Sequence, residues 1–237
     1  MINSPWIRKP NFKDIKSFDY DSYWDFRGWQ LRDSLKPREE IIYNYISAKS
    51  KVLDIGCGNS LLPVKLRAKN CDITVADISP KVLNAYHNLN IKTLTLDLLN
   101  FSKDEINDQF DFIILSEVLE HLPNPEEIIK KISLLSDKII ITIPNSAYFL
   151  FRLGLMFKGR FFTQWVYHPS EHLRFWSHLD FLDWLETMNL DVKKVFVSDG
   201  FTFRGLIKFL PKLWPNMFGF RMVYICSISD RMFGLSK

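Results

Sequence analysis

The stretch VLDIGCGNS, residues 52–60, decides the fold. A short apolar run ends here in an acid, Asp54, and two glycines, Gly56 and Gly58. Glycine at the end of a strand lets the backbone turn tightly into a helix and come close to a ligand. Dinucleotide enzymes carry G-x-G-x-x-G at the same point, so the two glycines alone are a weak signal. Here the third glycine is absent and Ser60 follows, which favours a ligand without a pyrophosphate.

Strand and helix patterns alternate along the chain on both sides of this loop. The expected strands are near-continuous runs of β-branched residues and leucine, which is typical of a sheet covered on both faces. Alternation of this kind predicts a parallel sheet with right-handed crossovers. Ser79 and Ser177 are expected to cap helices. We predict strands over 51–56, 72–79, 91–98, 110–117, 137–145, 191–200 and 221–229, and helices over 38–49, 60–69, 79–89, 125–136 and 179–190.

Two further acids stand where two of these strands end. Asp77 ends the second strand, at the distance from the glycine loop at which a carboxylate can accept both hydroxyls of a ribose. Asp97 ends the third strand and could accept an adenine amino group, while the Leu98 amide meets a ring nitrogen. Taken singly, Asp77 could be a helix cap and Asp97 a turn former. Their order along the sheet edge predicts a nucleoside-binding trough.

With these residues in place, the chain resembles the class I S-adenosylmethionine (SAM)-dependent methyltransferases. DIGCG is similar to their motif I, and FDFIILSEVLEHLPNP is similar to their motif IV region. The resemblance covers residues 51–145 well and the remainder more weakly, and Ser60 departs from the usual glycine. It implies a doubly wound α/β fold, Rossmann-like, with a seven-stranded sheet whose last strand is antiparallel. It also implies SAM across the strand ends, near Asp54, Gly56, Gly58, Asp77, Ile78, Asp97, Leu98 and Ser116.

Composition sets limits on the class of protein. The chain has 237 residues, of which 47% are hydrophobic and 24% charged, as in an ordinary α/β domain with modest additions. We predict one domain over 1–237: an aromatic arm or lid at 1–37, a cofactor-binding half at 38–145 and a substrate-covering half at 146–237. The net charge of +4 is compatible with an anionic acceptor and too small for a nucleic-acid partner.

The cysteines and the hydropathy of the sequence indicate in which cellular compartment the protein is expected. Cys57, Cys71 and Cys226 are odd in number and show no C-x-x-C spacing, which fits a reducing environment. The first residues have no apolar core of a secretory signal, and no apolar run approaches the ~20 residues of a membrane span. We expect a cytoplasmic protein, either a monomer or a homodimer.

Histidines are the candidate catalytic bases. An alcohol acceptor must lose a proton, and a neutral histidine is suited to take it. HLRFWS, residues 172–177, resembles a segment of many small-molecule methyltransferases that precedes the helix before the sixth strand. His172 is the first candidate base, followed by His168 and His121. As substrate-binding residues we predict Tyr23, Arg160 and Arg174, the arginines as clamps for an anionic acceptor. In the alternative interpretation, His172 and Arg174 only brace their loop.

The segment SEVLEHL raises the question of a metal. Glu117, Glu120 and His121 form an E-x-x-E-H set, whose members would share one face of a helix. Some quinone-type O-methyltransferases use a similar set with a divalent metal, but E-H-L also occurs in metal-free relatives. We expect no metal here.

Two apolar, basic segments, 148–166 and 201–219, bear on the acceptor. They are expected to pack as a lid over it. A less favoured role for the two segments is contact with a membrane surface, which a lipid-quinone acceptor would need. A third possible role is to form the contact between two copies in a homodimer. The stretch 143–160 also resembles the MetW-like branch of the fold. The preferred function is O-methylation of a small molecule or a sugar- or phosphate-bearing conjugate, as in surface-polysaccharide biosynthesis. The alternatives are a quinone or lipid O-methyltransferase and a MetW-like partner subunit with weak catalysis of its own.

Overall fold

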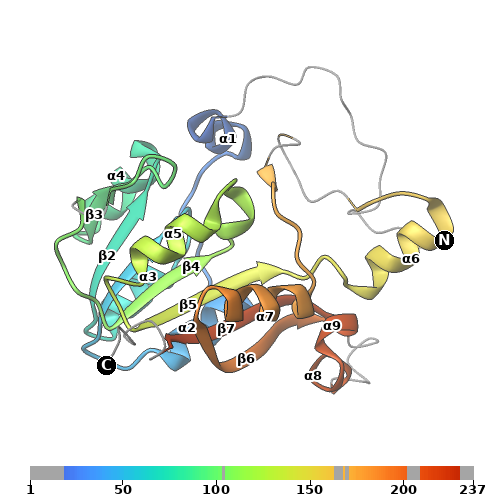
Figure 1. Ribbon diagram of the computed structural model, residues 1–237. Helices are drawn as coiled ribbons and strands as arrows, with labels where there is room; N and C mark the ends of the chain where they lie inside the picture. Colours follow the sequence, from blue (N-terminus) through green and yellow to red (C-terminus); the bar gives the residue numbers. More distant parts are fainter. Residues whose placement is uncertain (1–18, 103–104, 163–167, 169–170, 202–208, 230–237) are drawn as a thin grey trace, which may run out of the picture.

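The computed structural model describes residues 19–102, 105–162, 168, 171–201 and 209–229. Their strands form one seven-stranded sheet of order β3-β2-β1-β4-β5-β7-β6 (Figure 1). β1 to β5 run parallel, and β7 is antiparallel to both of its neighbours. The predicted fold is thereby confirmed. The strands are β1 Lys51–Ile55, β2 Asp72–Asp77, β3 Lys92–Thr95, β4 Phe112–Ser116, β5 Lys138–Pro144, β6 Leu190–Gly200 and β7 Gly219–Ile228.

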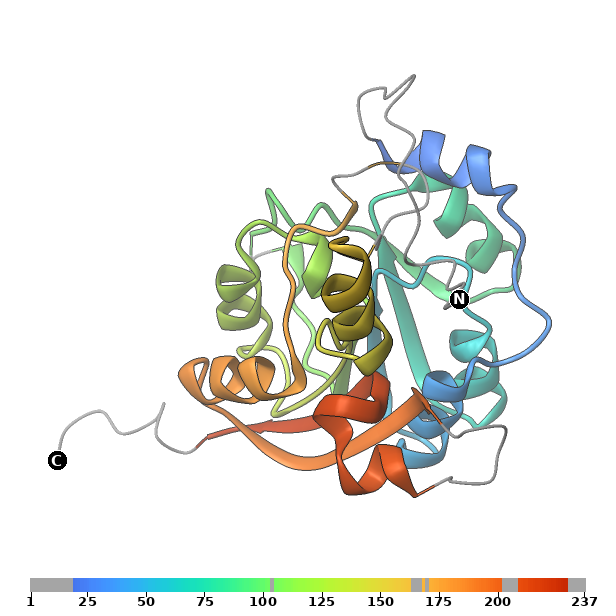
Figure 2. The same ribbon diagram turned by 90° about the vertical axis from the view of Figure 1, so that its right-hand side faces the viewer.

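Helices cover both faces of the sheet (Figures 1 and 2). α5 and α7 pack on one face, and α2, α3 and α4 pack on the other, so two apolar clusters sandwich the strands. This arrangement explains the near-continuous apolar strands, because both sides of each central strand are buried. The helices are α1 Tyr20–Arg27, α2 Pro37–Tyr45, α3 Leu62–Ala68, α4 Pro80–Asn88, α5 Pro125–Ile132, α6 Phe149–Lys158, α7 His178–Thr187, α8 Leu210–Leu213 and α9 Pro215–Phe218, with a 3-10 turn, η2, at Leu119–His121.

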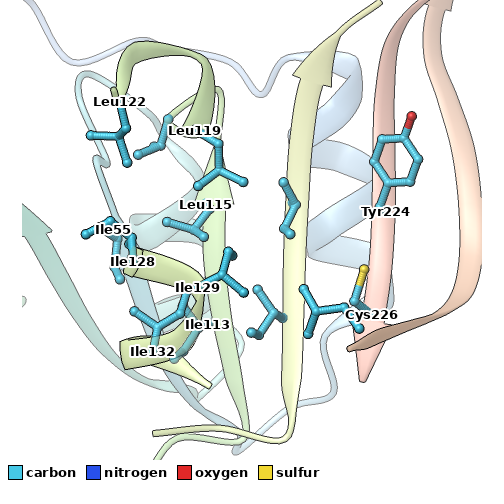
Figure 3. Packing of buried hydrophobic residues seen from close by; sticks show 14 of the residues in the cluster. Ile55, Ile113, Leu115, Leu119, Leu122, Ile128, Ile129, Ile132, Tyr224 and Cys226 are labelled. Carbon is cyan, nitrogen blue, oxygen red and sulfur yellow. The ribbon is translucent and has the colours of Figure 1, made fainter. Parts of the chain in front are cut away.

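The packing of α5 illustrates how sequence spacing builds the core. Ile128, Ile129 and Ile132 lie on one side of the helix and face the sheet near Ile113 and Leu115 of β4 (Figure 3). All five side chains are at most 4% exposed. Burial of each contributes about 1.5–3 kcal/mol, so this contact is a major contribution to the packing of α5 on the sheet.

Of the two predicted helix caps, Ser177 is confirmed and Ser79 is not. Ser177 caps α7 as predicted, with its side chain accepting a hydrogen bond from the Asp180 amide. Ser79 stands before α4, but its hydroxyl makes no cap and donates to Asp21 of α1 over 2.6 Å. The reason is tertiary, since α1 brings a carboxylate within reach. This bond attaches α1 to the start of α4.

α1 and the segment that joins it to α2 pack on the rest of the chain. Trp24, Trp29, Leu31 and Leu35 lie against the cluster beneath α2, α3 and α4. The first 18 residues of the predicted arm lie outside the described residues. Within the described part of the chain, every helix is too short or too polar to span a membrane.

The turn after β1 generates a test of the fold. Gly56 has φ of +68°, and a Cβ there would lie 2.6 Å from a methyl carbon of Val118. Gly159 has φ of +59° and nothing within 4 Å of a Cβ. Alanine at either position would lower the free energy of unfolding by about 1–2 kcal/mol, because a residue with a Cβ is strained in the left-handed conformation. We therefore expect Gly56→Ala to lower the free energy of unfolding, measured by urea denaturation, by more than Gly159→Ala. Equal losses would contradict the close contact at Gly56.

Candidate active site

A cavity of about 380 Å³ opens at the carboxyl ends of the parallel strands. It lies where the strand order reverses, between β1 and β4, which is the position at which open α/β sheets bind ligands. Its walls come from the ends of β1 to β4, from α1 and the start of α2, and from parts of α6, β7 and the loop at 171–172. The volume is within the range of small-molecule and cofactor sites.

The structure brings all the residues predicted for the cofactor to this cavity. They come from four different strand ends, which parallel strands place at one edge of the sheet. The cavity wall includes Asp54, Gly56, Gly58, Asp77, Ile78, Asp97, Leu98 and Ser116.

Asp77 is held by backbone amides and faces the cavity. One carboxylate oxygen accepts from the Gly58 amide at 3.1 Å and the other from the Ser79 amide at 3.0 Å. The residue is only 7% exposed, and burial raises the pKa of its carboxyl. Each oxygen has a further lone pair, so the carboxylate can still accept from two hydroxyls of a ligand.

Asp97 both shapes its own turn and lines the cavity. Its oxygens accept from the Leu99 amide at 2.9 Å and from the Asn100 side chain at 2.7 Å. The turn-former interpretation therefore describes part of its role, and lone pairs remain for a ligand.

The loop after β1 is braced from below by a buried tyrosine. The Tyr86 hydroxyl lies 2.6 Å from the Ser60 carbonyl and 3.2 Å from that of Gly58. Ser60, which replaces the usual glycine, accepts from the Leu62 amide through its hydroxyl at 3.1 Å. The substitution thus supplies a side-chain acceptor at the start of α3. Across the loop, Gly58 leaves room for the ring of Trp24, which would lie 3.1 Å from a Cβ.

Arg38 is a cavity residue that the sequence analysis missed. It is 6% exposed, and its Nε donates to Ser116 Oγ at 3.2 Å. Its Nη2 lies 3.3 Å from Glu117, whereas its Nη1 is buried with no hydrogen-bond partner among the described residues. A buried donor left unpaired is costly, so an anionic group in the cavity would be favoured beside it. Its only sequence signal is a basic residue in the first turn of a helix, which is common.

Glu117 is held between two guanidinium groups. Its carboxylate contacts Arg38 and, at 3.0 Å, Nε of Arg221 from β7. Burial by itself would raise the pKa of Glu117, but the two arginines outweigh it and hold that pKa below its usual value. The residue has φ of +57°, so the chain leaves β4 in a left-handed turn.

That turn overturns the prediction that Glu117, Glu120 and His121 share one helical face. Glu117 lies before η2 and points to the arginines, while Glu120 joins His121 and His172 instead. Glu120 is 1% exposed, and neither of its carboxylate oxygens has a partner among the described residues. Burial, and then the charge of Glu117, raises the pKa of Glu120 well above its usual value.

The two histidines of this group meet edge to face. Their ring centroids lie 4.7 Å apart, and Nδ1 of His121 is hydrogen-bonded to the Glu171 carbonyl. Burial, and then the neighbouring His121, lowers the pKa of His172 to about 3, so its imidazole is neutral at physiological pH. One ligand atom from each of Glu120, His121 and His172 lies within 4.8 Å of the others. The group is compact enough to share one proton or to hold one cation.

Of the other predicted site residues, Tyr23 lies at the cavity, whereas His168, Arg160 and Arg174 lie elsewhere. Tyr23 lines the cavity, and its hydroxyl accepts from Arg27 at 2.6 Å. His168, Arg160 and Arg174 are not among the described residues of the cavity wall. Arg174 donates to the Pro123 carbonyl and pairs with Glu126, which is the bracing role considered as an alternative. Arg160 is exposed after α6.

Comparison with known proteins agrees with this geometry. A family model described as "Methionine biosynthesis protein MetW" matches residues 36–226. The chain is 28% identical over 173 residues to the bifunctional methionine biosynthesis protein MetXA/MetW of Rhodopirellula baltica, covering 66% of this chain and 27% of that one. It is 32% identical over 197 residues to the ubiquinone biosynthesis O-methyltransferase of Glaesserella parasuis, covering 72% and 81%. The corresponding protein of Coxiella burnetii is 30% identical, with 57% and 60% covered.

A solved structure shows the same fold. The 1,6-didemethyltoxoflavin-N1-methyltransferase of Burkholderia thailandensis, with S-adenosylhomocysteine bound, superposes with a TM-score of 0.61 at 15% identity, covering 89% of this chain and 85% of that one. These comparisons confirm the predicted class I methyltransferase fold, and S-adenosylhomocysteine is a ligand of that solved structure.

The two acids after β4 give a paired test. Because the pKa of Glu117 is lowered by folding, its contribution to stability is present at neutral pH and is lost as the pH falls through its folded pKa. Glu120, with a raised pKa, has the opposite sign and destabilises the fold as the pH rises. At pH 7 we expect Glu117→Gln to lower the free energy of unfolding by about 1–3 kcal/mol and Glu120→Gln to raise it.

The difference for Glu120→Gln should disappear below about pH 4, where ordinary glutamates are protonated. The difference for Glu117→Gln should persist to lower pH and disappear only below the lowered pKa of the folded Glu117 carboxyl. Urea denaturation across pH, in buffer with a chelator, measures them. A loss of stability at pH 7 in Glu120→Gln would contradict the assignment of Glu120 as an unpaired buried acid.

Proposed function

The chain belongs to the MetW family of methionine biosynthesis proteins, and we propose that it is a SAM-dependent O-methyltransferase of a small, ring-bearing acceptor. The observation that carries the proposal is one cavity at the strand switch point. There the glycine loop, Asp77 and the unpaired donor of Arg38 face a pair of neutral histidines.

The cavity residues fit the three parts of SAM. Asp77 has lone pairs for the ribose hydroxyls, and Asp97 with the Leu98 amide stands where the adenine would lie. The Nη1 of Arg38 is a buried cationic donor that a carboxylate would satisfy. When bound, SAM supplies an electrophilic methyl group, so the protein has to align the acceptor and exclude water.

Proton removal is assigned to the histidine pair. A hydroxyl acceptor loses its proton as the new carbon–oxygen bond forms, and a positioned base accelerates this by ~10²–10⁴-fold. His172 lines the cavity with a neutral imidazole that has a lone pair for that proton. Burial also makes this imidazole a weak base, so it can hold the proton only transiently. His121 and Glu120 lie next to it, so the proton can be shared within the group. An oxygen acceptor is favoured because such a base is needed there.

The aromatic wall of the cavity favours a flat acceptor. Tyr20, Tyr23, Trp24, Phe151 and Phe220 all line it, and such rings stack on planar ligands. Relatives named ubiquinone biosynthesis O-methyltransferase agree with an aromatic hydroxyl compound.

A sugar- or phosphate-bearing acceptor, as in surface-polysaccharide biosynthesis, is the second candidate. It is favoured by cations of the cavity wall, Arg27 and Lys36. Burial, and then Arg38, lowers the pKa of Lys36 to about 8, which leaves the amine mostly charged at pH 7. Assays of methyl transfer from SAM to catechols and to nucleotide-linked sugars, followed by mass spectrometry, distinguish the two candidates.

A partner subunit with weak catalysis of its own is the alternative from another class. It is supported by the relative that joins MetXA and MetW in one chain. Turnover of a catechol by the isolated chain would argue against it.

The orientation of the cofactor can be tested with two variants and two ligands. S-adenosylhomocysteine carries the amino-acid part, and methylthioadenosine lacks it. We expect Asp77→Ala to weaken both ligands about tenfold to a hundredfold, because a charged acceptor for the ribose is lost. Arg38→Gln should weaken S-adenosylhomocysteine by a similar factor and leave methylthioadenosine nearly unchanged.

Isothermal calorimetry measures the four affinities. Asp72→Ala, at the exposed start of the same strand, is the matched control for Asp77→Ala, and thermal melting checks that each variant folds. If Arg38→Gln weakened both ligands equally, the assignment of Arg38 to the carboxylate would be wrong.

The role of His172 has its own test. His172→Ala should lower kcat for the methylation of a catechol by ~10²-fold or more, while the affinity for S-adenosylhomocysteine stays within about twofold. Added imidazole should restore part of the rate, which a purely structural role would not allow. His87→Ala, on the exposed side of α4, is the control. Full activity of His172→Ala would remove it as the base.

A further inference from the structure

The two apolar segments predicted to pack as a lid have a large exposed portion. α6 directs Phe151 and Gly154 inward, and Phe151 lines the cavity. On its other side, Met156 is 66% exposed and Phe157 is 72% exposed, and Phe161 just beyond is 77% exposed. Within α6, the packing expected from sequence therefore holds for the inner side and not for the outer side.

A second exposed apolar group lies around α8, which is linked through α9 to the start of α6. Phe209, Leu213 and Trp214, around α8, are 60%, 74% and 53% exposed. The two groups are joined by the contact of Arg152 with the Asn216 carbonyl at 3.3 Å and by the Phe149–Phe218 ring pair. Figures 1 and 2 show α6, α8 and α9 at the same end of the molecule, with α6 projecting from the body. We call this surface the α6–α8 face.

The charge on this face has one sign. Arg152, Lys158, Arg160 and Lys212 are exposed around the apolar side chains. The sequence contains no Asp or Glu from 146 to 170 or from 201 to 229. Exposed Phe, Leu and Trp with interspersed cations are the composition of segments that lie in the interface of an anionic bilayer.

From these observations we infer that the α6–α8 face docks the protein on the surface of an anionic lipid bilayer. A second copy of the chain is less suitable, because a two-fold contact through this face would bring its cations against one another. Docking through the outer side of α6 would leave its inner side, with Phe151, facing the cavity. The inference does not depend on the proposed reaction.

Vesicle sedimentation tests it directly with the full chain. We expect the protein to sediment with vesicles containing phosphatidylglycerol and to remain in solution with phosphatidylcholine alone. The pair Lys158→Glu and Arg160→Glu should weaken binding about tenfold or more by reversing two charges at the surface. The pair Phe157→Ser and Trp214→Ser should weaken it about tenfold or more through lost apolar insertion.

A control pair lies away from the α6–α8 face, in α5 and just after it. Lys130→Glu and Leu134→Ser change one exposed cation and one half-exposed leucine there, and binding should stay as in the unchanged chain. Circular dichroism and thermal melting verify folding of all variants. No ligand or acceptor is needed, so the outcome is separate from that of the methyl-transfer assays.

Three outcomes would overturn the inference. The first is failure of the unchanged chain to sediment with phosphatidylglycerol vesicles. The second is equal binding by the control pair and both face variants. The third is a concentration-dependent dimer, seen by analytical ultracentrifugation, that Phe157→Ser and Trp214→Ser abolish without any vesicle binding, which would assign the face to a second copy.

Discussion

The hydrogen bond from the Gly58 amide to Asp77 joins the turn after β1 to the end of β2, and the geometry of the cavity depends on it. A buried carboxylate needs donors, and here backbone amides supply them, from Gly58 of the glycine turn and from Ser79, which precedes α4. The turn must therefore adopt the left-handed conformation that Gly56 and Gly58 permit. The same bond aims the remaining lone pairs of Asp77 into the cavity.

Two buried acids at the far wall of the cavity, Glu117 and Glu120, have different partners and therefore different protonation states. Glu117 is surrounded by Arg38 and Arg221 and keeps its charge, whereas Glu120, three residues on, has no partner among the described residues and favours its neutral form. Groups in one site whose pKa values move apart are typical of acid–base chemistry. The charge of Glu117 balances the arginines, and Arg38 retains one donor for a ligand.

The α6–α8 face and the cavity share a helix. α6 is apolar almost all round, which in a soluble domain indicates two contacts instead of one. Its inner side meets the cavity through Phe151, and its outer side carries exposed rings and cations. A hydrophobic acceptor held in a bilayer would lie close to both.

The sequence by itself determined the sheet, the glycine turn and the carboxylates at the strand ends. Those features follow from local periodicity and from the rule that parallel strands end at one edge, so Asp54, Asp77 and Asp97 could be placed from spacing alone. The sequence did not determine the partners of the polar side chains, because these come from segments far apart in the chain. Arg38 meets Glu117 across 79 positions of sequence and Arg221 meets it across 104, and no local pattern records such pairs.

The tertiary structure alone decided which predicted residues share the site. The left-handed turn at Glu117 separated it from Glu120 and His121, and the loop at 171–174 brought His172 to them while turning Arg174 toward Glu126. It also decided that the outer side of α6 is exposed. The physical reason is the same in each case: periodicity fixes which face of an element is apolar, but only the packing of distant elements determines what that face meets.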